Sequence, residues 1–199
     1  MEKVSFGATN RFCPQALYLY GTYKEDGSAN LGTHCWFGFC WDDELSVMAC
    51  ISDGKLTIDR IRSEKVFSAN LVSEAMIPLA DYLGYTEGYT PGKMDISIEV
   101  ERGTVLPVPI LKDSPLTFEL EVKQSLPLGG SELFICRIRN VLAMKELMDE
   151  SRDAEELMQL AAPVVWAGAD INRYFSVNPV VKGVAESWKD LFGAKENLP

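Results

Sequence analysis

Short apolar runs dominate the first quarter of the chain, and their lengths are those of β-strands. Residues 16–23 are rich in tyrosine and leucine and lead to the dipeptide Asp26-Gly27, a common hairpin turn. Residues 30–41 are apolar and aromatic on both faces, and residues 45–52 form another continuous apolar run. Strands that are buried on both sides have this composition. The pattern therefore predicts three consecutive strands.

The period of the apolar positions then changes. Apolar residues at helical spacing predict a helix over 56–64, and the segment after it predicts a short strand over 66–71. A second helix is predicted from Glu74 onward, with Gly84 as the C′ residue that ends it. Helices thus interrupt a series of strands.

The second half of the chain predicts a hairpin and more helices. Residues 85–115 are rich in glycine and proline and are expected to form loops. Residues 116–123 alternate between apolar and charged types, and residues 133–141 form a further apolar run after a Gly-Gly turn, so the two predict a β-hairpin. Helices are predicted over 154–161 and 181–192.

About six strands with inserted helices favour a mainly β fold, a six-stranded Greek-key barrel, over an alternating βα sheet. The sequence contains neither the G-x-G-x-x-G pattern of a Rossmann unit nor a Walker A sequence. It also shows no repeat, low-complexity tract or linker. We therefore expect one domain over residues 1–199.

The net charge of the chain argues against some classes of binding partner. The formal net charge is −10 and the pI is about 4.7, which argues against nucleic acid and against an anionic membrane surface. The N-terminus lacks a basic start followed by an apolar run, and no stretch approaches the roughly 18 apolar residues of a membrane span. We expect a cytoplasmic protein.

Five cysteines and one histidine limit disulfide and metal chemistry. The cysteine number is odd and no C-x-x-C pair occurs, so neither a disulfide framework nor a zinc site is indicated. Buried free thiols are the simplest interpretation. A redox role for one of them is the alternative.

Candidate chemistry is densest where the strand over 45–52 passes into the first helix. Unpaired N–H groups at a helix start attract an anion, and Lys55 and the hydroxyl of Thr57 would add donors. We interpret this turn, together with Ser52, as a candidate phosphate cradle. The alternative is an ordinary strand-to-helix turn in which Thr57 serves only as a local cap.

A second group of polar residues lies inside the buried strand at 30–36. Asn30 and His34 need hydrogen-bond partners there, and a planar heterocycle with several acceptors would supply them. The alternative is that both bond to neighbouring backbone. The histidine lies in no serine or cysteine nucleophile motif. We therefore assign no catalytic residue, and a cofactor that brings its own chemistry fits best.

The order and spacing of these segments resemble the flavin reductase-like family, the FMN-binding split barrels that include flavoredoxin. The resemblance covers roughly residues 14–175. Its pieces are residues 20–30 with a D-G-x-x-N turn, 33–36, 52–61, 65–70, the pair Leu83-Gly84 and the loop lysine Lys93.

The resemblance implies a six-stranded Greek-key split barrel, usually a homodimer with FMN near the subunit interface. The resemblance also implies which residues run along the edge of the isoalloxazine ring: Asn30, Leu31, Gly32, Thr33, His34 and Cys35. It implies that the phosphate is bound by Ser52, Lys55 and Thr57. It further implies that Asn70 supports the ribityl or phosphate region and that Lys93 approaches the ring.

Three functions stay open at this stage. The first is an FMN-dependent reductase that takes electrons from NAD(P)H or from a protein donor. The second is a flavin-binding electron carrier without nicotinamide-dependent turnover of its own, and the third is a structural barrel that has lost flavin. The aromatic residues within 36–41 also predict a homodimer, and an ordinary core is the alternative explanation for them.

Overall fold

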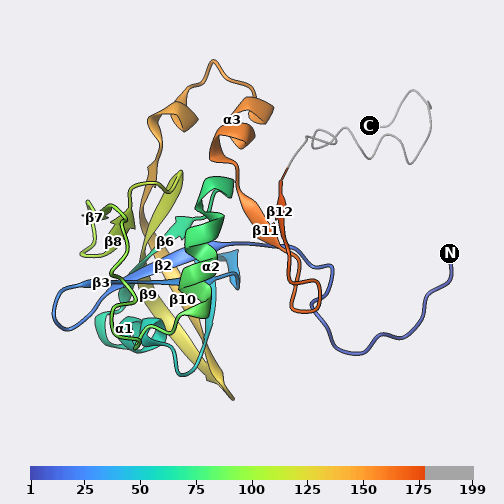
Figure 1. Cartoon of the computed structure of the whole chain (residues 1–199), viewed down its shortest axis with the longest axis horizontal. Helices are drawn as coiled ribbons and strands as arrows, with labels where there is room; N and C mark the ends of the chain where they lie inside the picture. Colours follow the sequence, from blue (N-terminus) through green and yellow to red (C-terminus); the bar gives the residue numbers. More distant parts are fainter. Residues whose placement is uncertain (178–199) are drawn as a thin grey trace.

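The computed structural model describes residues 1–177, so the helix predicted over 181–192 lies outside the described residues. Within residues 1–177 an antiparallel sheet dominates (Figure 1). It has seven strands, in the order β3-β2-β6-β9-β10-β5-β4. Its strands are β2 (Tyr18–Tyr23), β3 (Ala29–His34), β4 (Phe37–Asp42), β5 (Glu44–Ser52), β6 (Val66–Leu71), β9 (Leu116–Leu128) and β10 (Ser131–Ala143).

The sheet curls round on itself. β3 and β4 stand at the two ends of the hydrogen-bonded order, yet only Cys35 and Trp36 separate them in the chain. The predicted mainly β split barrel is therefore confirmed, with a larger strand number than expected. The single strand predicted over 30–41 is wrong, because the chain turns at Cys35 and Trp36 and crosses from β2 to pair with β5.

Short strands form two smaller sheets that the sequence pattern did not predict. β1 (Gln15–Ala16), β11 (Val164–Trp166) and β12 (Tyr174–Ser176) pair in the order β1-β11-β12. β7 (Val100–Arg102) and β8 (Pro109–Leu111) pair inside the segment predicted as loop. Three residues flanked by proline and glycine are too few to show a period, which explains why β7 and β8 were missed.

Three α-helices lie among the strands of the described part: α1 (Leu56–Glu64), α2 (Ile77–Tyr85) and α3 (Ala154–Ala161). The 3-10 turns η1 (Glu74–Met76) and η2 (Lys145–Met148) accompany them. The prediction that Gly84 ends its helix is wrong, because α2 continues to Tyr85 and Thr86 is its C-cap. A Cβ at Gly84 would lie 3.4 Å from the Cβ of Thr33, so this glycine lets α2 pack closely on β3.

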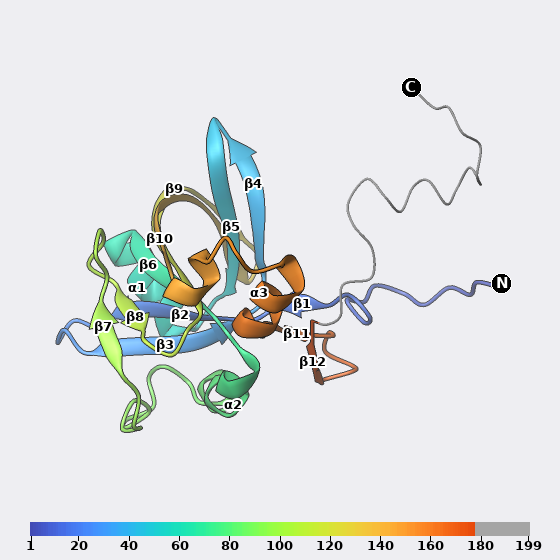
Figure 2. The same cartoon turned by 90° about the horizontal axis from the view of Figure 1, so that it is seen from above.

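Two apolar clusters position α1 and α2. Ile58 and Ile61 of α1 are buried with Tyr20, Phe67 and Phe134 inside the barrel. Residues of α2 are buried in a second cluster with β3 and β11; its members include Leu17, Leu31, Ala80, Leu83 and Val164. Figure 2 shows α1 and α2 on opposite sides of β3. The start of α1 and the end of α2 therefore approach the same strand.

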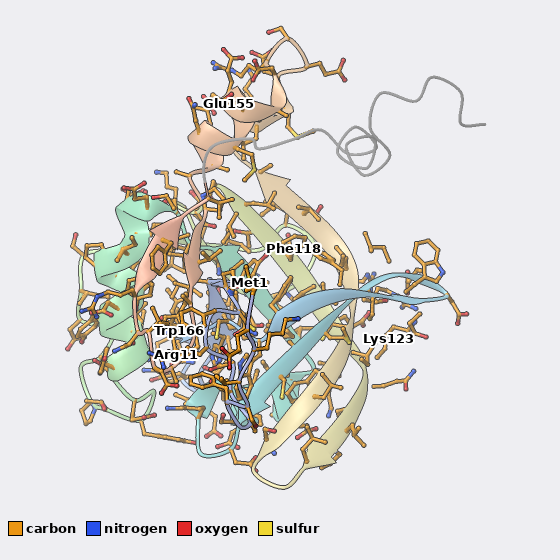
Figure 3. All side chains as sticks on the ribbon, turned by 90° about the vertical axis from the view of Figure 1, so that its right-hand side faces the viewer. Met1, Arg11, Phe118, Lys123, Glu155 and Trp166 are labelled. Carbon is orange, nitrogen blue, oxygen red and sulfur yellow. The ribbon has the colours of Figure 1, made fainter. Side chains whose placement is uncertain are left out.

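The hairpin of β4 and β5 projects from the body of the molecule (Figure 2). It carries exposed apolar side chains, among which Trp41 is 79% exposed. Figure 3 shows Lys123 of β9 beside this hairpin, and its Nζ lies 3.0 Å from Oδ2 of Asp42. In the part of the chain up to residue 177, none of the helices has the length and apolarity needed to cross a membrane.

Candidate functional site

Three cavities adjoin one another along the end of β3, and all three are lined by Thr33 and His34. We name each cavity by its position or by the residues that line it besides these two. The inner cavity, about 30 Å³, is lined by Gly32, Lys55, Thr57, Glu87 and Lys93. The thiol cavity, about 180 Å³, is lined by Cys35, Trp36, Cys50, Ser52 and Lys55. The aromatic cavity, about 260 Å³, is lined by Cys35, Tyr85, Trp166, Asn172 and Tyr174.

The start of α1 forms one wall of the inner cavity. Lys55 is the N-cap residue, with extended backbone and no side-chain cap. Thr57 is therefore not the cap of this helix, and its hydroxyl takes part in a different contact. The free N–H groups of a first helical turn carry partial positive charge and favour an anion.

Asn30 of β3 contacts Thr57 and is fully buried. Its Nδ2 donates to Oγ1 of Thr57 and to Oγ1 of Thr22, each at 3.2 Å. Because the oxygen of Thr57 accepts this bond, its own hydroxyl hydrogen stays free to donate into the inner cavity. Asn30 thereby orients a donor toward the cavity.

Two lysines give the inner cavity its positive charge. Lys93 is only 4% exposed, and its Nζ donates to the carbonyl of Leu83 at 3.2 Å. Burial lowers the pKa of Lys93 to about 8. Within residues 1–177 no carboxylate forms an ion pair with it, whereas Lys55 pairs with Glu87 at 2.7 Å. A buried ammonium with donors to spare calls for an anionic partner.

His34 supplies a neutral polar surface between the cavities. Its ring stacks on Tyr20 with centroids 4.5 Å apart. Burial lowers the pKa of His34 to about 3, and the charges of Lys55 and Lys93 act in the same direction. The imidazole is therefore uncharged near neutral pH and offers both a donor and an acceptor.

The thiol and aromatic cavities have aromatic side chains in their walls. Trp36 borders the first, while Trp166 and Tyr174 border the second. Cys35 lies between them, and burial raises the pKa of its thiol to about 11. Aromatic walls with a few polar groups suit a planar heterocycle. The donors of the inner cavity suit its phosphate, so the residues present fit a phosphorylated flavin.

The structure brings most of the sequence-predicted residues to these cavities. Those that line at least one cavity are Gly32, Thr33, His34, Cys35, Ser52, Lys55, Thr57 and Lys93. Leu31 packs in the apolar cluster beneath α2, and Asn30 acts through Thr57. Lys93, which the resemblance implies near the ring, lines the inner cavity together with Lys55.

Asn70 is placed elsewhere. It lies on β6, and its Nδ2 donates to the carbonyl of Leu19 at 2.8 Å. Its Oδ1 accepts from the backbone N–H of Leu111 and the hydroxyl of Thr117. These bonds tie β6 to its neighbours, and Asn70 lines none of the three cavities.

Sequence reasoning missed two groups of cavity residues. Glu87 and Gly88 follow α2, in a segment marked only as loop-rich. Trp166 and Tyr174 come from β11 and β12, short strands for which the sequence pattern predicted no element and no role. No local pattern links either group to β3, because the contacts are formed by tertiary packing.

Comparison with known proteins shows the family of the chain. The family model described as flavin reductase like domain matches residues 10–173. An uncharacterized protein of Aeropyrum pernix is 24% identical over 170 residues, which are 84% of this chain and 63% of that relative. The chain thus spans less than two thirds of the relative's length.

Solved structures share the fold. Flavoredoxin from Methanosarcina acetivorans has a TM-score of 0.83 at 20% identity, over 96% of this chain and 100% of that one. Flavoredoxin of Desulfovibrio vulgaris (Miyazaki F) has a TM-score of 0.83 at 22% identity, over 94% and 99%. An FMN-binding protein from Thermus thermophilus with bound p-hydroxybenzaldehyde has a TM-score of 0.74 at 18% identity, over 92% and 97%. Because the family model covers most of the sequence, the chain belongs to the flavin reductase-like family of flavin-related redox proteins.

Proposed function

We propose that this protein binds FMN and passes electrons through it. The phosphate would be held in the inner cavity, and the isoalloxazine ring along the thiol and aromatic cavities. The observation that carries the proposal is the meeting of Lys55, Thr57 and Lys93 in one cavity that adjoins the aromatic-walled space at His34.

The flavin would supply the redox chemistry, and the chain would bind and orient it. Two ammonium groups and the first turn of α1 would neutralise the phosphate. The hydroxyl of Thr57, held by Asn30, would fix the position of one phosphate oxygen. The uncharged His34 would contribute hydrogen bonding at the junction of the cavities without adding a charge beside the ring.

We favour a reductase, in which NAD(P)H or an electron-transfer protein reduces the bound flavin. Structural relatives include the flavin reductase PheA2 and the Thermus thermophilus FMN-binding protein. The aromatic cavity offers space for a second planar molecule or for part of the flavin itself. The alternative is an electron carrier without turnover, which the likeness to flavoredoxins supports.

Two measurements test these proposals. Heat release of the bound chromophore, followed by mass measurement, should identify FMN; a protein that stays colourless and ignores added FMN would refute the flavin proposal. Steady-state oxidation of NADH or NADPH by the FMN-loaded protein should show turnover. Absence of turnover with both nicotinamides would refute the NAD(P)H-dependent reductase and leave the carrier or a reductase with a protein donor.

We also propose a homodimer that buries the projecting β4–β5 hairpin. Phe39, Trp41 and Leu45 are at least half exposed there, and exposed apolar patches often mark interfaces. Sedimentation at micromolar concentration should give twice the chain mass, and Trp41→Glu should shift it toward monomer. A wild-type monomer would contradict the dimer.

All five cysteines are free, which supports a cytoplasmic location.

A further inference from the structure

We propose that Glu87 occupies the anion position of the inner cavity and must leave Lys55 when the phosphate of the flavin enters. The carboxylate would thus act as a built-in competitor that lowers the affinity for phosphorylated flavins. This inference rests on the proposed function, because it concerns the same cavity. It adds a residue that sets how strongly a phosphate is preferred.

The first support is the contact itself. Oε1 of Glu87 lies 2.7 Å from Nζ of Lys55, and both residues line the inner cavity. Lys55 is also the N-cap residue of α1. The Glu87 carboxylate therefore already supplies a negative charge near the partial positive charge of the helix start, where the phosphate would bind.

The second support is the size of the cavity. With Glu87 in place the inner cavity measures about 30 Å³, room for about one to three water molecules. A phosphate group carries four oxygens and is larger than this space, so it would need the room that the carboxylate takes. Because the Glu87 side chain is 56% exposed, it can rotate into solvent without uncovering an apolar core.

The third support is the packing of the loop that follows Glu87 against α1. A Cβ on Gly88 would lie 2.6 Å from the Cβ of Leu56, so the loop backbone is in close contact with α1. The hydroxyl of Tyr89 donates to Oδ2 of Asp59 on the same helix. The backbone after Glu87 is thus held against α1, and before Glu87 the N–H of Thr86 donates to the carbonyl of Tyr82 at 3.0 Å. Entry of a phosphate then needs a rotation of Glu87 and no opening of the loop.

Charge gives the direction of the effect. The inner cavity holds two ammonium groups, those of Lys55 and Lys93, and one carboxylate, that of Glu87. A bound phosphate would repel this carboxylate and would compete with it for Lys55. Replacing Glu87 by glutamine removes the repulsion and weakens the competition, while the side chain keeps nearly the same shape.

The test compares two flavins that differ only in the phosphate. FMN and riboflavin are titrated into apoprotein, and quenching of flavin fluorescence gives each Kd. Glu87→Gln should raise the affinity for FMN about three- to tenfold and leave the affinity for riboflavin within about twofold. Inorganic phosphate alone should also bind the variant more tightly than it binds the wild type, since the freed site binds phosphate itself.

Glu99→Gln is the matched control. Glu99 is an exposed carboxylate that pairs with Lys112 away from the cavities, so the variant removes the same charge at another site. It should leave both flavin affinities unchanged. An equal gain in Glu99→Gln and Glu87→Gln would reduce the effect to net charge and overturn the inference.

Other outcomes separate this inference from the proposed function. Weaker FMN binding by Glu87→Gln would mean that Glu87 holds Lys55 in place for the phosphate, and it would overturn the inference while FMN binding stands. An FMN affinity that does not change would also overturn it. If the wild-type protein binds neither flavin, the proposed function fails first.

Discussion

The side-chain amide of Asn30 and the hydroxyl of Thr57, 27 residues apart in the sequence, meet at 3.2 Å between Nδ2 and Oγ1. This bond joins β3 to the first turn of α1 and decides where the hydroxyl hydrogen of Thr57 points. Asn30→Asp replaces the donor by an acceptor, so the hydroxyl would turn away from the inner cavity. We predict at least about tenfold weaker FMN binding and a smaller loss for riboflavin, measured by fluorescence titration. Equal losses for the two flavins would argue against a phosphate at Thr57.

Thr57 itself offers a cleaner pair of variants. Thr57→Val keeps the shape of the side chain and removes the hydroxyl, which should weaken FMN binding about five- to thirtyfold. Thr57→Ser keeps the hydroxyl and should restore most of the affinity. The thermal midpoint of each apoprotein controls for stability, because the bond to Asn30 is lost in the valine variant. If serine fails to rescue binding, the methyl group rather than the hydroxyl is what matters.

The pH dependence of FMN binding should follow Lys93. Burial lowers the pKa of its ammonium to about 8, so this lysine loses its charge within a range that is easily measured. A phosphate prefers the charged form, and affinity should therefore be highest below pH 8 and should decline as the pH rises through 8. The phosphate itself is fully ionised above about pH 7.

Lys93→Met should bind FMN more weakly at pH 7 and should lose the decline between pH 7 and 9. Lys112→Met, which removes an exposed lysine paired with Glu99, should keep the wild-type profile. A decline that persists unchanged in Lys93→Met would show that another group controls it.

His34 should make the protein less stable in acid. Its pKa is about 3 in the folded protein and about 6.5 in an unfolded chain. Between these values the unfolded chain binds a proton that the folded protein does not, so the free energy of unfolding falls as the pH drops from 6.5 toward 3. The contribution is at most about 1.4 kcal/mol per pH unit. Urea unfolding of His34→Gln should give a shallower slope than the wild type in this window, and an identical slope would contradict the assignment.

The rate at which Cys35 is alkylated should show whether the flavin ring lies beside it. Cys35 lines both the thiol and the aromatic cavity, and its raised pKa of about 11 keeps the thiol protonated near neutral pH. Iodoacetamide should therefore label the exposed Cys13 faster than Cys35, as read by peptide mass mapping. Saturation with FMN should slow the labelling of Cys35 further, by about fivefold or more, without protecting Cys13. Labelling of Cys35 that ignores FMN would place the ring elsewhere.

Local pattern predicted those elements whose boundaries are set within a few residues. The helix Leu56–Glu64 and the strand Val66–Leu71 match the sequence expectation, because each has a clear period and a turn on either side. The break at Trp36 was missed because tertiary pairing creates it: the carbonyl of Trp36 accepts from the N–H of Cys50. The continuation of α2 past Gly84 likewise depends on packing against Thr33, which no local signal reveals.

The candidate site divides in the same way. Lys55 and Thr57 could be found from sequence, because a strand, a turn and a helix start follow one another in the chain. The setting of Lys93 could not, since the chain must fold back after α2 to bring its Nζ to the carbonyl of Leu83. Glu87 carried no signal at all, because it becomes relevant only where the fold brings it to Lys55.

A crystal structure of the protein soaked or grown with FMN tests the central claim most directly. The account predicts the phosphate within hydrogen-bond distance of Thr57, Lys55 and Lys93, with Glu87 turned away from Lys55 and the ring against His34 and Cys35. A phosphate bound at another place, with the Lys55–Glu87 pair still closed, would contradict it.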